Sequence, residues 1–182
     1  MQKGSLYSLI HDHQVAIGWQ RAKKVCLDTC CGMSYLHSLK PPLVHRDLKS
    51  GNLLVGEDWN TKIADFGLSR LMPEINETLT ACGTPAWSAP ELLQNEKYNE
   101  TVDVYSFAIV MWELLTRKTP YEGLDAYQII FSVSSQQARP PVPKSIADFP
   151  VQYVALMKKC WADDPESRPT FSSLEQYFSE NL

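Results

Sequence analysis

The stretch of residues 102–116 constrains the fold more than any other part of this sequence. It reads VDVYSFAIVMWELLT, so a helix formed there would carry apolar side chains on nearly every face. A helix that faces solvent keeps a polar side, and this one has almost none. Its most apolar part, residues 107–115, is about half as long as a segment that spans a bilayer. We therefore expect a buried helix at the centre of a globular domain.

Helical periodicity recurs on both sides of this stretch. Apolar side chains at three- and four-residue spacing over residues 15–39 predict a long amphipathic helix. Pro41 and Pro42 should end it, because proline cannot donate the backbone hydrogen bond that a helix interior needs. Shorter helices are expected near the start of the chain, from residue 4 onward, and at residues 126–134, 151–162 and 170–181.

Other segments predict strands and a loop. Residues 44–55 and 61–64 are short and β-prone, and the polar residues 56–60 between them favour a turn, so we expect a small hairpin. Residues 68–85 show no sustained periodicity and are rich in Thr, Asn, Glu and Pro. They are predicted to form a mobile surface loop.

Composition bounds the class of protein. The 182 residues, 44% of them hydrophobic, suffice for one domain with a substantial core but not for two ordinary ones. The net charge of −4 gives no global field that would attract nucleic acid or an anionic membrane, so neither is expected as a partner. The first residues lack the apolar core of a signal peptide, and the five cysteines show no disulfide framework. A cytoplasmic or nuclear location fits best.

Three of the cysteines allow two interpretations. Cys26, Cys30 and Cys31 are close enough in sequence to suggest a metal cluster. However, they fall in a helical pattern with no nearby CxxC spacing and no matched pair of histidines. We therefore expect core or half-buried thiols.

Three short motifs follow one another in the middle of the chain. Residues 45–54 read HRDLKSGNLL, residues 63–70 read IADFGLSR and residues 83–91 read GTPAWSAPE. Each motif alone is weak evidence, because a given tripeptide arises often by chance. Their order and separation together indicate a phosphoryl-transfer site. The alternative is that Asp47 and Asp65 only cap local backbone amides in turns.

With these motifs, the chain resembles a protein kinase of the tyrosine kinase-like group, which includes Raf-like and mixed-lineage kinases. The resemblance also rests on GSLYSLIH, GMSYLHS, DVYSFAIVMWELLT and CWADDPESRPTF, and it covers only a carboxyl-terminal lobe, over residues 1–182. The fold class that it implies is mainly α with a small β-hairpin region. Ser88 stands where this group commonly has methionine and Ala108 where glycine is usual, but neither change removes a catalytic group.

The resemblance implies roles for residues of the first two motifs. Asp47 would accept the proton of a substrate hydroxyl, and Lys49 would contact ATP and neutralise charge on the transferring phosphoryl group. Asn52 and Asp65 would supply oxygen ligands to Mg²⁺. Three residues would lie near the ribose and adenine of ATP: Ser5, Leu6 and Leu54.

The same resemblance implies that three residues have structural roles. Asp103 would hold the backbone of the HRDLKSGN segment. Arg168 would be the buried partner of Glu91. The alternative for this pair is a surface ion pair, worth less than about 1 kcal/mol.

The choice of acceptor residue rests on Lys49 and Thr84. The sequences HRDLKS and GTPAW resemble the serine/threonine pattern more than the tyrosine pattern, and Thr84 could hydrogen-bond Asp47 and Lys49. We therefore expect a protein substrate that is phosphorylated on serine or threonine.

Regulation is implied for the segment between the second and third motifs. In kinases of this type, the arginine before the catalytic aspartate, here Arg46, binds a phosphate on this segment. Thr78 and Thr80 are the best acceptors. The alternative is that both are ordinary threonines of a hydrophilic loop.

Three parts of a complete kinase are missing from this sequence: a GxGxxG loop, a strand lysine of the VAIK type and a helical glutamate to pair with it. ATP would be held from one side only, and a misplacement of about 1 Å can cost on the order of a hundredfold in rate, so we expect the isolated chain to be inactive. The exposed floor of the cleft predicts a covering partner, either an amino-terminal lobe or another protein.

Two functions remain open. The chain could belong to a serine/threonine kinase whose amino-terminal lobe is not in this sequence, or it could be an inactive lobe that binds proteins. Asp47, Asn52 and Asp65 are all present, which favours the kinase. A purely structural helical domain would leave the ordered motifs unexplained.

Overall fold

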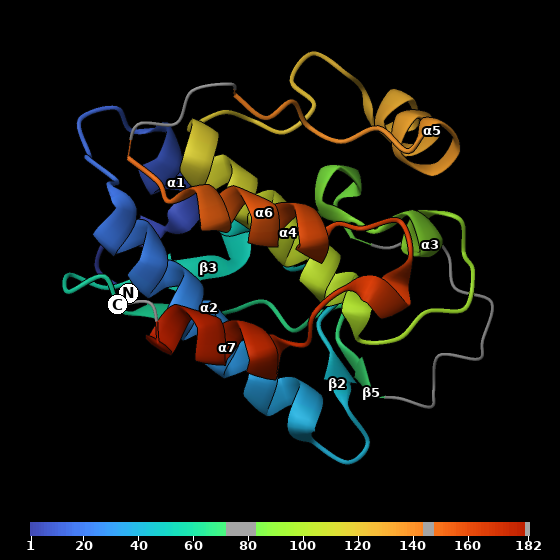
Figure 1. The fold of residues 1–182 in the computed structure, drawn as a ribbon, viewed down its shortest axis with the longest axis horizontal. Coiled ribbons are helices and arrows are strands. Elements are labelled where there is room, and N and C mark those ends of the chain that lie inside the picture. Colours follow the sequence, from blue (N-terminus) through green and yellow to red (C-terminus); the bar gives the residue numbers. More distant parts are fainter. Residues whose placement is uncertain (72–82, 144–147, 181–182) are drawn as a thin grey trace.

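The computed structural model describes residues 1–71, 83–143 and 148–180 (Figure 1). Helix α4 (Thr101–Thr116) forms the centre of the fold, and every residue from 102 to 114 is buried. The prediction of a buried central helix is confirmed. The expected fold class, mainly helical with a small β region, is confirmed as well.

The other helices pack around α4. Helices α2 (Trp19–Ser38) and α7 (Phe171–Glu180) lie side by side, and α6 (Val151–Cys160) packs on α4 (Figure 1). Aromatic rings fill the space between α4 and α7, where the Phe107 ring lies 5.5 Å from that of Phe171 and 6.4 Å from that of Phe178, centroid to centroid. The remaining helices are α1 (Leu6–His11), α3 (Pro90–Leu93) and α5 (Ala126–Gln136).

Helix α2 begins at Trp19 rather than at residue 15, where periodicity predicted its start. The reason is a distant side chain. Arg117 follows α4 and donates to the Val15 carbonyl at 3.0 Å and to the Ile10 carbonyl at 2.6 Å. The carbonyl of Val15 therefore bonds outside the helix, and the segment before Trp19 connects α1 to α2. At the other end α2 stops at Ser38, before the two prolines, as expected.

Two small antiparallel sheets accompany the helices. β3 (Leu53–Val55) lies between β1 (Gly4–Ser5) and β4 (Thr61–Ile63), and β2 (Leu43–Val44) pairs with β5 (Arg70–Leu71). In the hairpin of β3 and β4, Val55 lies opposite Thr61, which confirms the turn predicted at residues 56–60.

The predicted β segment at residues 44–55 is wrong in extent. Only its two ends are strands, and Ser50–Asn52 forms a 3-10 helix. Residues 45–52, here called the HRD loop, leave the strand conformation at Arg46, whose φ is +66°. The carboxylate that holds this turn comes from α4, so no local pattern encodes it.

The third motif adds a 3-10 helix at Pro85–Trp87 and the short helix α3, neither of which periodicity predicted. Both are too short to show a repeat. Most of the predicted loop at residues 68–85 lies outside the described residues.

Cys26 and Cys30 are fully buried, which confirms the expected core thiols. Burial raises the pKa of the Cys26 thiol to about 12. Cys31 is exposed, so the expectation of a buried or half-buried thiol is wrong for it. Within the described ranges, no group of three or more His, Cys, Asp or Glu residues could hold a metal ion. No helix there is long and apolar enough to cross a membrane.

Candidate active site

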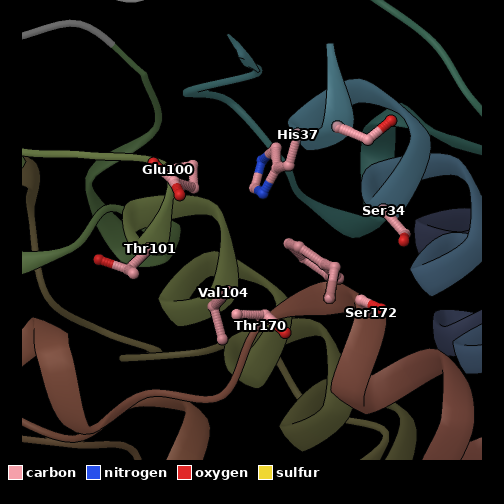
Figure 2. Close-up of a pocket in the computed structure, with 9 residues that line it drawn as sticks. Ser34, His37, Glu100, Thr101, Val104, Thr170 and Ser172 are labelled. Atoms are coloured by element: carbon pink, nitrogen blue, oxygen red, sulfur yellow. The ribbon is translucent and has the colours of Figure 1, made fainter. Parts of the chain in front are cut away.

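A single buried carboxylate, that of Asp103, binds the backbone of the HRD loop. Asp103, in the first turn of α4, has no exposed surface. Its Oδ2 accepts a hydrogen bond from the backbone amide of His45 and its Oδ1 one from the amide of Arg46, each at 2.8 Å. His37, which projects from α2 (Figure 2), donates from Nε2 to the same Oδ2 at 2.9 Å. Asp103 therefore fixes the backbone at the start of the loop.

Four side chains converge on the loop and are called here the Asp47 cluster: Asp47, Lys49, Asn52 and Thr84. Asp47 Oδ1 accepts from the Thr84 hydroxyl at 2.9 Å and from the Thr84 amide at 3.1 Å. Asp47 Oδ2 accepts from Lys49 Nζ at 2.8 Å and from Asn52 Nδ2 at 3.1 Å. Lys49 Nζ also donates to Thr84 Oγ1 at 2.7 Å. Asp47 and Thr84, which are 37 positions apart in the sequence, are thus joined by hydrogen bonds to the Asp47 carboxylate.

Asn52, in this cluster, and Asp65, in the second motif, each carry a side-chain oxygen that could bind a metal ion. The Asn52 amide donates to the Asp47 carbonyl at 2.8 Å, while its Oδ1 accepts from no side chain or amide of the described ranges. Asp65 is exposed, with φ of +63°, and among the described residues its carboxylate accepts only a long bond of 3.4 Å, from the Gly67 amide. Amide and carboxylate oxygens are hard ligands of the kind that Mg²⁺ prefers.

A hydrogen bond ties the segment of Asp65 to the HRD loop. His45 Nε2 bonds to the Ala64 carbonyl at 3.1 Å, directly before Asp65. The backbone amide of Asp47 donates to Nδ1 of the same ring at 3.3 Å. One imidazole therefore contacts both acidic motifs.

The three residues expected near a nucleotide do not share one environment. Ser5 in β1 lies directly opposite Leu54 in β3, so these two side chains are on the same face of the sheet. Leu6 has no exposed surface, because it begins α1 and packs with Leu9 and Ile10 on the buried face of that helix. The expectation that Leu6 contacts adenine is therefore wrong.

Comparison with known proteins identifies the chain. A family model described as "Protein tyrosine and serine/threonine kinase" matches residues 1–178. The chain belongs to this protein kinase family. It is 46% identical over 170 residues to "Probable serine/threonine-protein kinase drkB" and 45% identical over 177 residues to "Probable serine/threonine-protein kinase drkC", both of Dictyostelium discoideum. These matches cover 93% and 96% of this chain but only 24% and 23% of the relatives, so the chain spans about a quarter of their length.

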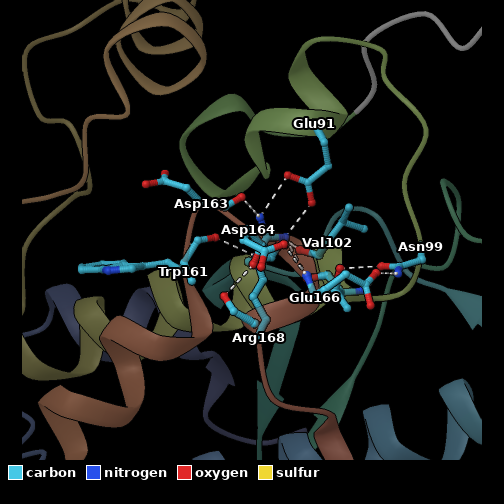
Figure 3. A network of polar contacts seen from close by, with 12 residues as sticks. Glu91, Asn99, Val102, Trp161, Asp163, Asp164, Glu166 and Arg168 are labelled. Carbon is cyan, nitrogen blue, oxygen red and sulfur yellow. Dashed lines mark hydrogen bonds and ion pairs between the residues drawn. The ribbon is translucent and has the colours of Figure 1, made fainter.

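The chain also has a buried ion pair outside the Asp47 cluster, formed by Arg168 and Glu91. Arg168 donates from Nη1 to Glu91 Oε1 at 2.6 Å and from Nη2 to Oε2 at 3.0 Å (Figure 3). Both residues are buried, with 5% and 6% of their surface exposed. Arg168 Nε donates to the Ala162 carbonyl at 2.9 Å, and its guanidinium lies over the Tyr105 ring at 5.3 Å. The pair ties α3, which begins at the end of the third motif, to the helical core.

Arg46 is nearly buried, with 4% of its surface exposed. Its Nε donates to the Leu68 carbonyl at 2.6 Å and its Nη1 to the Tyr98 hydroxyl at 3.2 Å. Leu68 precedes the segment that was expected to carry the regulatory threonines. Thr78 and Thr80 themselves lie outside the described residues.

Sequence reasoning missed Glu113, which joins the HRD loop to the third motif. This residue of α4 has no exposed surface, and its carboxylate accepts from the Ser50 hydroxyl at 2.7 Å and from Trp87 Nε1 at 2.8 Å. Burial raises its pKa to about 7, although the two hydrogen bonds act in the opposite direction. A carboxylate inside an otherwise apolar helix was the signal that could have identified it.

Proposed function

We propose that the chain is the carboxyl-terminal lobe of a serine/threonine protein kinase, and that a lobe not included in residues 1–182 covers the nucleotide. The observation that carries this proposal is the Asp47 cluster, in which a lysine, an asparagine and a threonine converge on one carboxylate. The relatives named as serine/threonine kinases support the choice of acceptor.

Asp47 would act as the base that orients the acceptor. The hydroxyl oxygen of a protein serine or threonine attacks the γ-phosphorus of ATP, the bond from that phosphorus to the ADP oxygen breaks, and the hydroxyl proton passes to Asp47. Asp47 is 7% exposed, and its oxygens are held by Lys49 and Thr84, so the carboxylate is positioned before substrate binds.

Lys49 would neutralise negative charge on the transferring phosphoryl group. Its ammonium already lies 2.8 Å from Asp47 and 2.7 Å from the Thr84 hydroxyl, beside the carboxylate that would receive the proton. Because Thr84 belongs to the segment before α3, its contact with Lys49 links that segment to catalysis. The contact between Lys49 and Thr84 fits the serine/threonine pattern that HRDLKS and GTPAW resemble, and so supports serine and threonine as acceptors.

Asn52 and Asp65 would hold Mg²⁺. Their oxygens fit this ion, which usually takes one or two protein ligands and completes its shell with phosphate oxygens and water. The ion would neutralise charge on the phosphates of ATP. The side chains of Ser5 and Leu54, which share one face of the sheet, would form the floor beneath the ribose and adenine.

One large apolar side chain next to Asp65 is exposed. Phe66, which follows Asp65, has 45% of its surface exposed although its ring contacts that of His45 at 5.2 Å. This exposed ring is available for contact with a covering lobe.

Arg46 would respond to phosphate on Thr78 or Thr80. A phosphate that approached its guanidinium would form charge-assisted hydrogen bonds and compete with the Leu68 carbonyl, which Arg46 binds here. Arg46 is next to Asp47 in the HRD loop, so such an exchange would reach the catalytic carboxylate directly.

The experiment that tests the assigned acceptor is phosphoamino-acid analysis. The protein that carries this chain together with its covering lobe would be incubated with Mg²⁺, radiolabelled ATP and a protein offering serine, threonine and tyrosine. We expect label on serine or threonine, and Thr84→Val should lower the transfer because Asp47 and Lys49 lose the hydroxyl between them. Label confined to tyrosine would contradict the proposal.

A further inference from the structure

A cavity of about 300 Å³ lies where the C-terminal end of α2 meets the first turns of α4 and α7 (Figure 2). None of its lining residues belongs to the Asp47 cluster or to the proposed nucleotide floor. Its volume is at the lower end of the range for pockets that bind small organic molecules. The residues that matter for the argument are Ser34, His37, Glu100, Val104, Thr170 and Phe171.

Two of these residues carry hydrogen-bond acceptors that are free within the described ranges. His37 Nε2 donates to Asp103, because a carboxylate only accepts, and in the tautomer that carries no further proton the other ring nitrogen, Nδ1, is an acceptor. No described residue donates to that Nδ1 or to the carboxylate of Glu100, which is half-buried. Figure 2 shows His37 and Glu100 on facing sides of the space between α2 and the start of α4.

The base of the cavity is largely apolar. Val104 and Phe171 each have 1% of their surface exposed, and the Phe171 ring meets the His37 ring edge to face at 5.2 Å. Thr170 and Ser34 add hydroxyls, which can donate or accept. By contrast, the Glu100 carboxylate and the Nδ1 acceptor of His37 can only accept hydrogen bonds. A ligand that satisfies both groups must therefore offer hydrogen-bond donors.

We propose that this cavity binds a small organic cation, namely a protonated amine on a short aromatic body. An ammonium group offers three N–H donors and no acceptor, which matches the Glu100 carboxylate and the His37 ring. The positive charge is attracted to Glu100, and the aromatic body packs against the apolar atoms that make up most of the cavity lining. An anionic ligand is disfavoured, because the carboxylates of Glu100 and Asp103 at the start of α4 would repel it.

An occupied cavity is connected to the HRD loop through His37. The ligand would hold the ring in the orientation that donates to Asp103, and the same carboxylate accepts from the amides of His45 and Arg46. Binding is therefore expected to reduce opening of the loop at these two amides. This inference does not depend on the chain being a kinase.

The test is an NMR titration of the protein containing this chain with 2-phenylethylamine, which is protonated at neutral pH. Its comparison ligand is 3-phenylpropionate, which has a similar body and an anionic head. We expect the amine to bind with a Kd on the order of 1 mM, to shift resonances of α2 and α4 residues that line the cavity, and to bind at least about tenfold more tightly than the acid.

Matched variants separate this site from binding elsewhere. Glu100→Gln should weaken the amine at least about tenfold, whereas Glu96→Gln, an exposed glutamate outside the cavity, should leave its Kd unchanged. Ser34→Phe, which places a ring in the cavity, should also abolish binding. At ten times the Kd, exchange of the His45 and Arg46 amides should slow by up to about tenfold in the unsubstituted protein.

Several results would overturn the inference. Equal binding of amine and acid would show that charge plays no part. The site would be excluded if Glu100→Gln and Glu96→Gln lost affinity for the amine equally, or if the shifted resonances mapped outside the cavity. No binding of the amine up to on the order of 10 mM would exclude it as well. Unchanged exchange at His45 and Arg46 with the cavity saturated would exclude the connection to the HRD loop.

Discussion

At the scale of single residues, Glu113 shows how one buried group affects both stability and the site. Its carboxylate accepts hydrogen bonds from Ser50 in the HRD loop and from Trp87 in the third motif. Ser50 lies between Lys49 and Asn52 of the Asp47 cluster in the sequence, and Trp87 lies three residues after Thr84 of the same cluster. The protonation state of Glu113 therefore acts on both.

Glu113 predicts a defined pH dependence of stability. Burial raises its pKa from 4.5 to about 7, so the folded protein binds a proton more tightly than the unfolded chain does. The free energy of unfolding should fall by about 3 kcal/mol as pH rises from 4.5 to 7, and stay level above that. Glu113→Gln keeps an acceptor for Trp87 and removes the titration, so its denaturation curves should lack this fall.

The control for Glu113 is Glu57→Gln, an exposed glutamate in the hairpin turn, which should keep the full pH dependence. Urea denaturation at a series of pH values measures all three proteins. Parallel pH profiles for Glu113→Gln and the unsubstituted protein would show that Glu113 does not titrate in this range.

Gly83, which precedes Thr84, predicts a steric effect on the Asp47 cluster. Its φ is +97°, and a Cβ there would lie 2.8 Å from the Arg46 carbonyl oxygen. Gly83→Ala should lower the free energy of unfolding by about 2 kcal/mol or more, since backbone strain and the clash add. Gly123→Ala is the matched control, because Gly123 has φ of +89° and no atom within 4 Å of the added Cβ, so it should cost only about 1 kcal/mol. Equal losses in thermal or chemical denaturation would mean that the contact with Arg46 is unimportant.

The residue types in the Asp47 cluster could be predicted from sequence, whereas the surroundings could not. The motif order placed Asp47, Lys49 and Thr84 together, and the structure brings them within hydrogen-bond distance. Leu6 was placed wrongly because the sequence motif does not show which of two neighbouring side chains is buried where a strand ends and a helix begins. Ser5 ends β1 and Leu6 begins α1.

At the scale of elements, long-range side chains decided what the local pattern could not. The strand predicted at residues 44–55 is interrupted because Asp103 holds the amides of residues 45 and 46. Helix α2 starts late because Arg117 binds the carbonyl of Val15. The central helix α4 was predictable, since its composition allows only a buried environment. Non-local partners account for each of these deviations.

The tie between α3 and the core predicts a large effect of one substitution. Arg168→Ala leaves the Glu91 carboxylate buried without its partner, and the free energy of unfolding should fall by about 3 to 5 kcal/mol. Chemical denaturation measures this loss. Lys24→Ala is the control, because the Lys24–Asp28 pair is exposed at 41% and 22% of its side chains and should contribute less than about 1 kcal/mol. A similarly small loss for Arg168→Ala would contradict a structural role for the buried pair.

At the scale of the whole molecule, we propose that the described fold forms one side of a site. The Asp47 cluster, the oxygens of Asn52 and Asp65, and the face shared by Ser5 and Leu54 belong to elements that α4 organises. No described residue provides the glycine-rich loop or strand lysine that phosphate binding in kinases requires. The proposed activity therefore belongs to the protein in which this chain is joined to a covering lobe.

The most direct test of this account is the rate of phosphate transfer after Asp47→Asn in that longer protein. Asparagine keeps the shape of the side chain but cannot accept the proton, so kcat should fall at least about a hundredfold while the KM for ATP changes little. Asp58→Asn, at an exposed aspartate in the hairpin turn, should retain full activity. If Asp47→Asn keeps a kcat within about threefold of the unsubstituted protein, Asp47 is not the base and the proposed site is wrong.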